Sequence, residues 1–275
     1  MPTWKTFLEW PPFTCRVRHR HLNWHPPAGK VWRLRHGRRR PQVSLDRRTG
    51  VGFDIQDLVL RLPVVLFSLT IHEFMHAWAA WKCGDDTARL QGRLTLNPLA
   101  HLDLVGTLCL LFAPIGWAKP VPVNPYNFRH PRRDEILVSG AGVAANFVAA
   151  VVLSMALRAM LAERIIVDNE VGRILFMLFV QAIIVNFCLF AFNLLPIPPL
   201  DGSHILREFL PGQLRAEFVQ LGRYGVFILV GVILLERRIH FEFLGYPNMS
   251  PLGVPLVALM HVFAGPSITH AVFGG

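Results

Sequence analysis

The sequence has few charged residues and no paired cysteines. Only 17% of its 275 residues are Asp, Glu, Lys or Arg, whereas 52% are hydrophobic. Soluble domains carry about 25% charged residues, so this composition disfavours a soluble enzyme and indicates a chain surrounded by lipid. The four cysteines form no Cys-x-x-Cys pair, which argues against a disulfide framework and against a thiolate zinc site.

The first residues lack the apolar stretch of a signal peptide, so we expect insertion through internal segments. The net charge of +10 comes entirely from residues 1–50, which hold twelve Lys or Arg and two acidic residues. We expect this arm to be disordered. Arg interleaved with Trp is found in RNA-binding and lipid-adhering segments, but no nucleic-acid-binding motif accompanies it. The alternatives are a solvated tail or a start codon assigned too far upstream, and no nucleic-acid partner is expected.

Apolar segments dominate the rest of the chain. A helix over residues 55–81 is long enough to cross a hydrocarbon core of about 30 Å. Two convincing spans follow, Ile136 to Leu161 and Ile174 to Leu195. Tyr224 to Leu235 and Leu252 to Phe273 are apolar but interrupted. We therefore predict three core spans, and four to six in all.

Two shorter segments do not fit a plain span. Leu104 to Ala118 contains two glycines and a proline and is short for a crossing, which favours a re-entrant element. Thr87 to Pro98 alternates polar and apolar residues, which predicts a short strand or hairpin at the membrane edge.

The first apolar segment contains a zinc motif, His72-Glu73-Phe74-Met75-His76. On a helix, residues four apart lie on one face, so His72 and His76 can point ring nitrogens at one zinc ion. Glu73 then lies beside the metal, where a carboxylate can take a proton from water as the water attacks a carbonyl.

A catalytic zinc needs a third protein ligand. The candidates are Asp201, Asp54, Asp57, Asp103, His101, His204 and a few loop carboxylates. Asp201 is favoured because it follows a membrane helix within the proline-broken segment Pro196-Ile197-Pro198-Pro199-Leu200-Asp201-Gly202, where an acidic residue is costly unless it is paired or ligated.

These motifs resemble the site-2 proteases, zinc metalloproteases that cut within membranes. The resemblance covers roughly residues 55 to 206 and includes Asn193-Leu194-Leu195 before the prolines, Gly92 to Pro98 and Gly116 to Pro125. It implies that Asp201 is the third ligand, that Glu73 is the general base, and that Asn146 faces the site and holds the substrate strand or the oxyanion. The family usually has Gly-Pro before this Asn, where the chain has Gly142-Val143.

The zinc site also constrains the topology. If Leu104 to Ala118 is re-entrant, the helix that carries His72 runs parallel to the helix that ends near Asp201. The ends of these two helices that bear the site then lie on one side of the membrane. Loops on that side hold ten basic residues, against three opposite, which places the site toward the cytoplasm by the positive-inside rule. The basic arm would then lie outside, which conflicts with the same rule.

We therefore predict a mainly α-helical, polytopic membrane bundle with a re-entrant segment and short membrane-edge strands. Residues 1–50 form the arm, 51–223 the protease core and 224–275 C-terminal membrane-associated helices. The predicted activity is hydrolysis, with one Zn²⁺ per chain, of peptide bonds in or near transmembrane segments of membrane proteins, in the plasma membrane of a prokaryote. The alternative is a zinc-binding membrane protein without proteolysis, such as a metal carrier or scaffold. The oligomeric state is left open.

Overall fold

The structure is a computed structural model that describes residues 55–107, 117–163, 165, 169–236, 238–239 and 241–273. Its helices are α2 (Ile55–Cys83), α3 (Thr87–Leu90), α5 (Pro131–Ala162), α6 (Glu170–Asn193), α7 (Asp201–Phe209), α8 (Gly212–Leu221), α9 (Gly225–Glu236), α10 (Gly253–Phe263) and α11 (Pro266–Phe273), with short 3₁₀ turns at Pro98–His101, Pro125–Asn127 and Gly222–Tyr224. The predicted arm lies outside the described residues.

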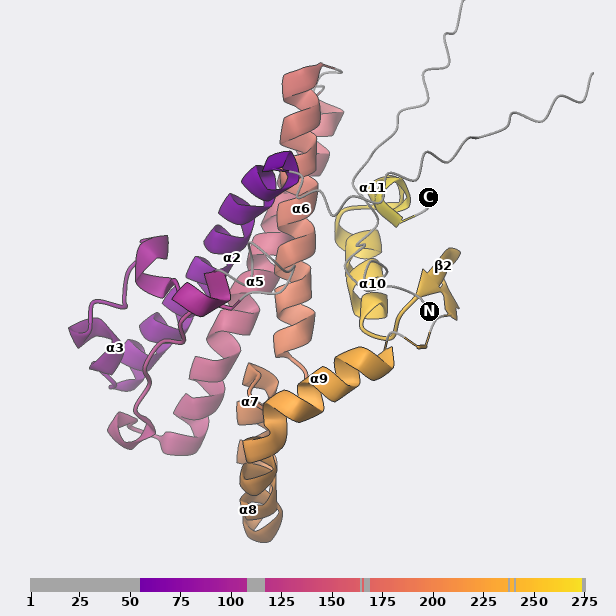
Figure 1. The fold of residues 1–275 in the computed structure, drawn as a ribbon. Helices are drawn as coiled ribbons and strands as arrows, with labels where there is room; N and C mark the ends of the chain where they lie inside the picture. Colours follow the sequence, from indigo (N-terminus) through magenta and orange to yellow (C-terminus); the bar gives the residue numbers. More distant parts are fainter. Residues whose placement is uncertain are drawn as a thin grey trace, which may run out of the picture.

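Three long helices, α2, α5 and α6, pack against one another and form the centre of the molecule. Figure 1 shows α2 and α6 running in one direction and α5 running back in the other. The end of α2 and the end of α6 therefore lie at the same end of the bundle, as the sequence predicts for a site shared between them.

Within the part of the chain that the structure describes, three helical segments are long and apolar enough to cross a membrane: α5, α6, and the segment from Gly212 to Glu236. The first two confirm the predicted spans, and the third includes one of the two interrupted segments. α2, which carries His72, Glu73 and His76, is not among the three. Large apolar side chains on α5, such as Val148, Val152 and Met155, are exposed, as expected of a helix surface that faces lipid.

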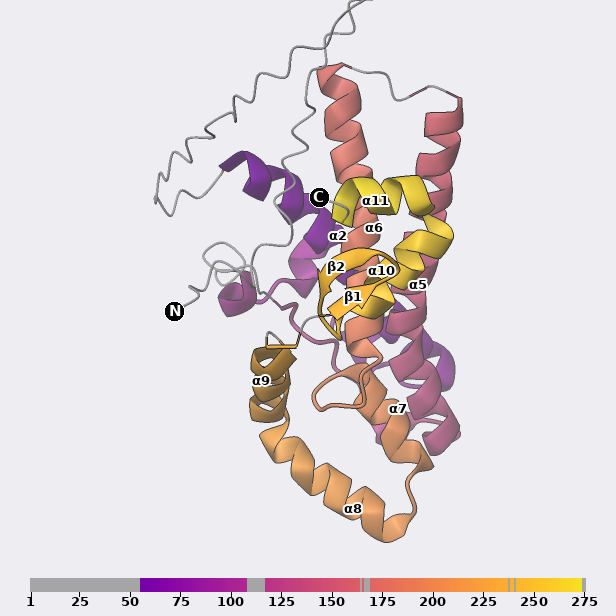
Figure 2. The same ribbon diagram turned by 90° about the vertical axis from the view of Figure 1, so that its right-hand side faces the viewer.

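The C-terminal helices pack on the central bundle. α10 contacts α5 and α6, and Met260 joins Leu157, Ile183 and Phe187 in a buried apolar cluster. Gly265, with a φ of 100°, separates α10 from α11, so the last apolar segment is two short helices. Figure 2 shows α10 and α11 against α5 and α6, whereas α8 and α9 form an arc that leads away from the bundle.

The predicted strand at Thr87 to Pro98 is wrong. The chain forms the single turn of α3 there, followed by irregular backbone and a 3₁₀ turn. The reason is Asp85, whose carboxylate accepts hydrogen bonds from the backbone N–H (3.1 Å) and the hydroxyl (2.5 Å) of Thr87 and so starts a helical turn. Among the described residues, strands occur only in the hairpin of β1 (Phe241–Phe243) and β2 (Tyr246–Met249).

The two ends of the predicted re-entrant segment lie side by side. Leu102 and Ala118 form an antiparallel bridge, and the N–H of Lys119 donates to the carbonyl oxygen of His101 over 2.8 Å. Residues 108–116, in the middle of the segment, lie outside the described residues. The chain thus returns at residue 118 to the place that it leaves at residue 102.

Candidate metal centre

Two histidines of α2 face each other across one helical turn. The Nε2 atoms of His72 and His76 are 3.0 Å apart, and the two rings meet edge to face with centroids 4.5 Å apart. Both side chains are buried. The helix therefore presents two imidazole nitrogens to one point, as the i, i+4 spacing predicts.

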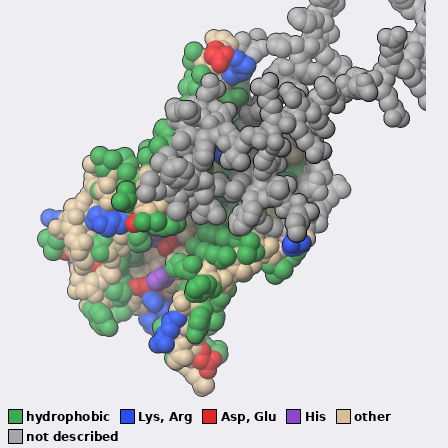
Figure 3. All heavy atoms as spheres, in the orientation of Figure 1, with side chains coloured by type: hydrophobic (Ala, Val, Ile, Leu, Met, Phe, Trp, Pro, Cys, Tyr) green, Lys and Arg blue, Asp and Glu red, His purple; other side chains and the backbone are tan. Residues whose placement is uncertain are grey.

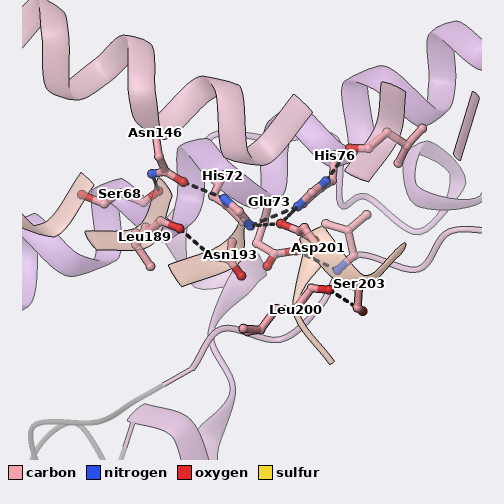
Figure 4. A network of polar contacts seen from close by, with 12 residues as sticks. Ser68, His72, Glu73, His76, Asn146, Leu189, Asn193, Leu200, Asp201 and Ser203 are labelled. Carbon is pink, nitrogen blue, oxygen red and sulfur yellow. Dashed lines mark hydrogen bonds and ion pairs between the residues drawn. The ribbon is translucent and has the colours of Figure 1, made fainter. Parts of the chain in front are cut away.

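Asp201 completes the cluster from the start of α7. Its Oδ2 atom lies 3.2 Å from the Nε2 of His72 and 3.3 Å from the Nε2 of His76 (Figure 4). The next residue, Gly202, lets the chain fold back onto the end of α6, since a Cβ there would lie 2.3 Å from the carbonyl oxygen of Leu194. The structure thus joins the two motifs that lie far apart in the sequence.

The remaining ring nitrogens of the two histidines show which atoms are free for a metal. Nδ1 of His76 lies 2.7 Å from the carbonyl oxygen of Val138, and Nδ1 of His72 lies 2.6 Å from Oδ1 of Asn146. A carbonyl oxygen only accepts, so both Nδ1 atoms carry hydrogen, and in the neutral form in which imidazole binds a metal both Nε2 atoms keep a lone pair. This arrangement, in which an outer partner orients a ligating imidazole, is usual at metal sites.

These three atoms fit a zinc ion. Oδ2 of Asp201 is buried without a hydrogen-bond donor, and it faces two imidazole lone pairs. Three electron-rich atoms that converge in a buried position need a cation between them. Two His and one carboxylate also match the ligand chemistry of catalytic zinc. Within the described residues, this is the one group of three or more His, Cys, Asp or Glu side chains close enough to hold a metal.

Gly142 of α5 makes room for the two rings, and sequence reasoning missed this. A Cβ at this position would lie 2.4 Å from Nε2 of His76 and 2.9 Å from Cε1 of His72. The small residues early in α5 predict close helix approach in general, but only the packed structure shows that the approach is to the imidazoles.

Glu73 lies next to the cluster and contacts an extended segment of the chain. Its Oε2 atom accepts a hydrogen bond of 2.9 Å from the backbone N–H of Val121. That segment is held in turn by Arg93, which donates to the carbonyl oxygen of Lys119 over 2.6 Å. The alternating prolines at 120 and 122 favour its extended form. The carboxylate is therefore fixed from a second part of the chain.

Asn146 also lies at the site, where its side chain contacts the imidazole of His72. Its side chain is fully buried, and Figure 4 shows it on the opposite side of His72 from Asp201. Its amide nitrogen contacts the carbonyl oxygen of Ser68 and Oδ1 of Asn186. Both the oxygen and the nitrogen of the Asn146 amide are therefore hydrogen-bonded to other protein atoms.

The other candidate ligands lie elsewhere. His101 is buried against the carbonyl oxygen of Thr95, and Asp103 accepts from the N–H of Gly106. His204 is half-exposed and contacts Glu135. Asp54 lies outside the described residues, and the structure does not describe the side chain of Asp57.

The polar turn after α2 is organised by a buried carboxylate. Asp85 is fully buried and accepts hydrogen bonds from the N–H of Asn124 and the amide of Asn127, both over 2.7 Å. Burial alone would raise the pKa of Asp85, but the hydrogen bonds from Asn124, Thr87 and Asn127 outweigh it and lower the pKa below its usual value. Asp85 therefore ties the end of α2 to the extended segment that contacts Glu73.

Comparison with known proteins identifies the class of protein. The model of "Peptidase family M50" matches residues 161–235, a range that contains Asp201. The chain is 43% identical over 169 residues to "Putative zinc metalloprotease YwhC" of Bacillus subtilis, covering 60% of this chain and 76% of that protein. It is 35% identical over 179 residues to "Putative zinc metalloprotease Rip2" of Mycolicibacterium smegmatis, covering 64% and 66%. No solved structure is a significant match.

The apolar helices and these relatives together define an intramembrane zinc metalloprotease. The chain belongs to peptidase family M50, the family of the site-2 proteases. Its relatives in this comparison are bacterial, and its helices make it a membrane protein. The alternative of a zinc-binding membrane protein without proteolysis is not favoured.

Proposed function

We propose that His72, His76 and Asp201 bind one zinc ion per chain and that Glu73 is the general base in the hydrolysis of membrane-protein substrates. The observation that carries this proposal is the convergence of three ligand atoms within 3.0 to 3.3 Å of one another. Figure 4 shows the side chain of Glu73 beside these three residues.

Zinc, when bound, supplies a Lewis acid that makes water more acidic and polarises the scissile carbonyl. Glu73 takes a proton from the attacking water as the C–O bond forms, and passes it to the amide nitrogen as the C–N bond breaks. The N–H of Val121 supports this role because it holds the charged carboxylate in one position. Histidines with fixed Nδ1 partners do not need to reorient during the reaction.

A helical substrate must be unwound before its carbonyl can be attacked, because helical carbonyls are hydrogen-bonded to the residue four positions on. The segment 119–123 supports an extended alignment. In extended backbone, residues two apart present their N–H and C=O groups to one edge, so Val121 and Val123 share the edge that meets Glu73. We propose that the unwound substrate lies along this edge, in place of the predicted strand at Thr87 to Pro98, and pairs with its backbone groups other than the N–H of Val121, which stays on Glu73.

We propose that α2 lies within the membrane together with α5 and α6, and that the segment from Leu104 to Ala118 is re-entrant. The bridge between Leu102 and Ala118 supports this topology because both ends of the segment lie at one place. The balance of basic residues supports a site toward the cytoplasm, and the bacterial relatives support the plasma membrane of a prokaryote. In this proposal residues 51–223 form the protease core and 224–275 the C-terminal membrane-associated helices.

The test is cleavage of a tagged transmembrane substrate by the full-length protein purified in detergent. Glu73→Gln removes the base but none of the proposed ligands, so we expect the rate to fall by about 10²- to 10⁴-fold while bound zinc stays at the wild-type level. Removal of zinc by a chelator abolishes cleavage, and added zinc restores it. Cleavage that survives either treatment contradicts the proposal.

A further inference from the structure

Three polar side chains from three helices meet inside the apolar bundle. Ser68 of α2, Asn146 of α5 and Asn186 of α6 are each fully buried, with an exposed fraction of 0%. Polar groups in such a position destabilise the fold unless they are hydrogen-bonded. The sequence motifs of the site include only one of the three, Asn146.

The donor and acceptor atoms of these side chains can be assigned from their hydrogen-bond partners. The amide nitrogen of Asn186 lies 2.8 Å from the carbonyl oxygen of Ala182, which only accepts, so Oδ1 of Asn186 faces Asn146. The amide nitrogen of Asn146 in turn lies 2.8 Å from that Oδ1 and 3.2 Å from the carbonyl oxygen of Ser68. Turning the Asn146 amide over would place its oxygen against two acceptors.

The oxygen of Asn146 must therefore face His72, at 2.6 Å from Nδ1. An acceptor there requires hydrogen on Nδ1, which leaves the lone pair on Nε2, the atom that faces Asp201 and His76. The second amide hydrogen of Asn186 goes to the hydroxyl of Ser68 over 2.9 Å, and that hydroxyl donates to the carbonyl oxygen of Val64 over 2.8 Å. Each of the three polar side chains is therefore hydrogen-bonded within the bundle.

We propose that Asn186, acting through Asn146, is a positioning residue that sets the tautomer and ring orientation of His72 for zinc. This inference rests on the proposed role of His72 as a ligand. It assigns Asn146 to the histidine and not to the oxyanion, since the amide hydrogens that an oxyanion would need are already donated to Ser68 and Asn186. It also gives α6 a part in the site besides leading to Asp201.

The test is the zinc affinity of the full-length protein in detergent, measured by competition with a chromogenic chelator. Loss of an outer partner of a ligand weakens metal binding by about 10- to 100-fold, so we expect a loss in that range for Asn146→Leu and about tenfold for Asn186→Leu. Asn186→Asp, which is neutral when buried and keeps an acceptor for Asn146, restores most of the affinity. Unchanged affinity in Asn186→Leu overturns the inference.

Ser154→Ala is the matched control. Ser154 is a fully buried polar residue of α5 whose hydroxyl has no hydrogen-bond partner, so its removal leaves zinc affinity unchanged. If Ser154→Ala loses as much zinc affinity as Asn186→Leu, the loss follows from removing any buried polar group, and the inference is overturned.

A second measurement separates the inference from the proposed function. In ¹⁵N-histidine NMR spectra of the zinc-free protein, in which no metal fixes the tautomer, the His72 signals, identified by their absence in His72→Gln, show an Nδ1–H tautomer in wild type and a changed signal in Asn186→Leu. If His72→Gln binds zinc as tightly as wild type, the ligand assignment fails. If His72 is a ligand and its tautomer signal is the same in Asn186→Leu, the positioning role alone fails.

Discussion

Gly142 lies so close to His76 that a Cβ at position 142 would fall 2.4 Å from the Nε2 atom of the imidazole. Helix α5 therefore approaches α2 as closely as the two histidine rings allow. The absence of a side chain at this position is as much a part of the site as the rings, since any larger residue would overlap the space that the rings occupy.

The first prediction concerns this glycine. Gly142→Ala pushes His76 away from Asp201, and a displacement of about 1 Å at a reacting group can cost about 100-fold in rate. We expect loss of substrate cleavage by about that factor, together with weaker zinc binding. Gly140→Ala is the control, because nothing lies within 4 Å of the Cβ that it adds. Equal activity of the two variants would contradict the packing argument.

The second prediction concerns the third ligand. Wild-type protein should contain about one zinc per chain, and Asp201→Ala should lose it, because two imidazoles remain where a catalytic site needs three protein ligands. The measurement is zinc content by atomic emission after gel filtration in detergent. Asp103→Ala removes a carboxylate that only accepts from the N–H of Gly106 and should keep its zinc. Full zinc content in Asp201→Ala would show that Asp201 does not share a zinc ion with the two histidines.

The third prediction concerns the backbone of residue 121. Val121→Pro removes the N–H that donates to Glu73 without adding a charged or polar group. A hydrogen bond to a charged group contributes about 1.5 to 3 kcal/mol, so we expect kcat to fall by about 10- to 100-fold with zinc content unchanged. Val121→Ala keeps the N–H and should keep kcat. If kcat falls as much in Val121→Ala as in Val121→Pro, the effect comes from loss of the valine side chain and not from loss of the N–H.

The fourth prediction concerns pH. The pKa of Asp85 is lower in the folded protein than its usual value, so its stabilising contribution is fully present above the pKa of the unfolded chain, about 3.9. This contribution is lost as the pH falls below that value toward the folded pKa. Asp85→Asn should destabilise the protein at pH 7 by about 1 to 3 kcal/mol and show a smaller drop in unfolding temperature between pH 7 and pH 3. Asp86→Asn, on an exposed residue that contacts Arg89, should keep the wild-type pH profile.

The sequence was sufficient to predict the parts of the site that depend on local spacing. The i, i+4 histidines needed only a helix, and the parallel course of α2 and α6 followed from the need for Asp201 to reach them. The prediction of a strand at Thr87 to Pro98 is wrong because the alternating pattern is weaker than the local hydrogen bonds that Thr87 donates to the side chain of Asp85. Asp85 owes its fixed position to Asn124 and Asn127, which lie about forty residues further along the chain.

Residues that act across helix contacts could not be predicted in this way. Gly142 resembles any small residue of a membrane helix, and Asn186 resembles any isolated polar residue within one. Their roles depend on which face of α5 or α6 meets α2, and helical periodicity in nearly uniform apolar sequence says little about that face. For Asn146 the family resemblance predicted the position, and only the structure shows the histidine as its partner.

The course of the chain through the site also has a consequence for biosynthesis. The candidate ligands come from the second half of α2 and from the first residue of α7, so the nascent protein has only two of them until residue 201 has left the ribosome and α6 has been inserted. A chain interrupted between residues 76 and 201 holds the glutamate and both histidines but lacks the carboxylate beside them. With the ligands proposed above, a chain that ends before residue 201 lacks one of the three ligands, and the proposed site is completed only when α7 follows α6 out of the ribosome.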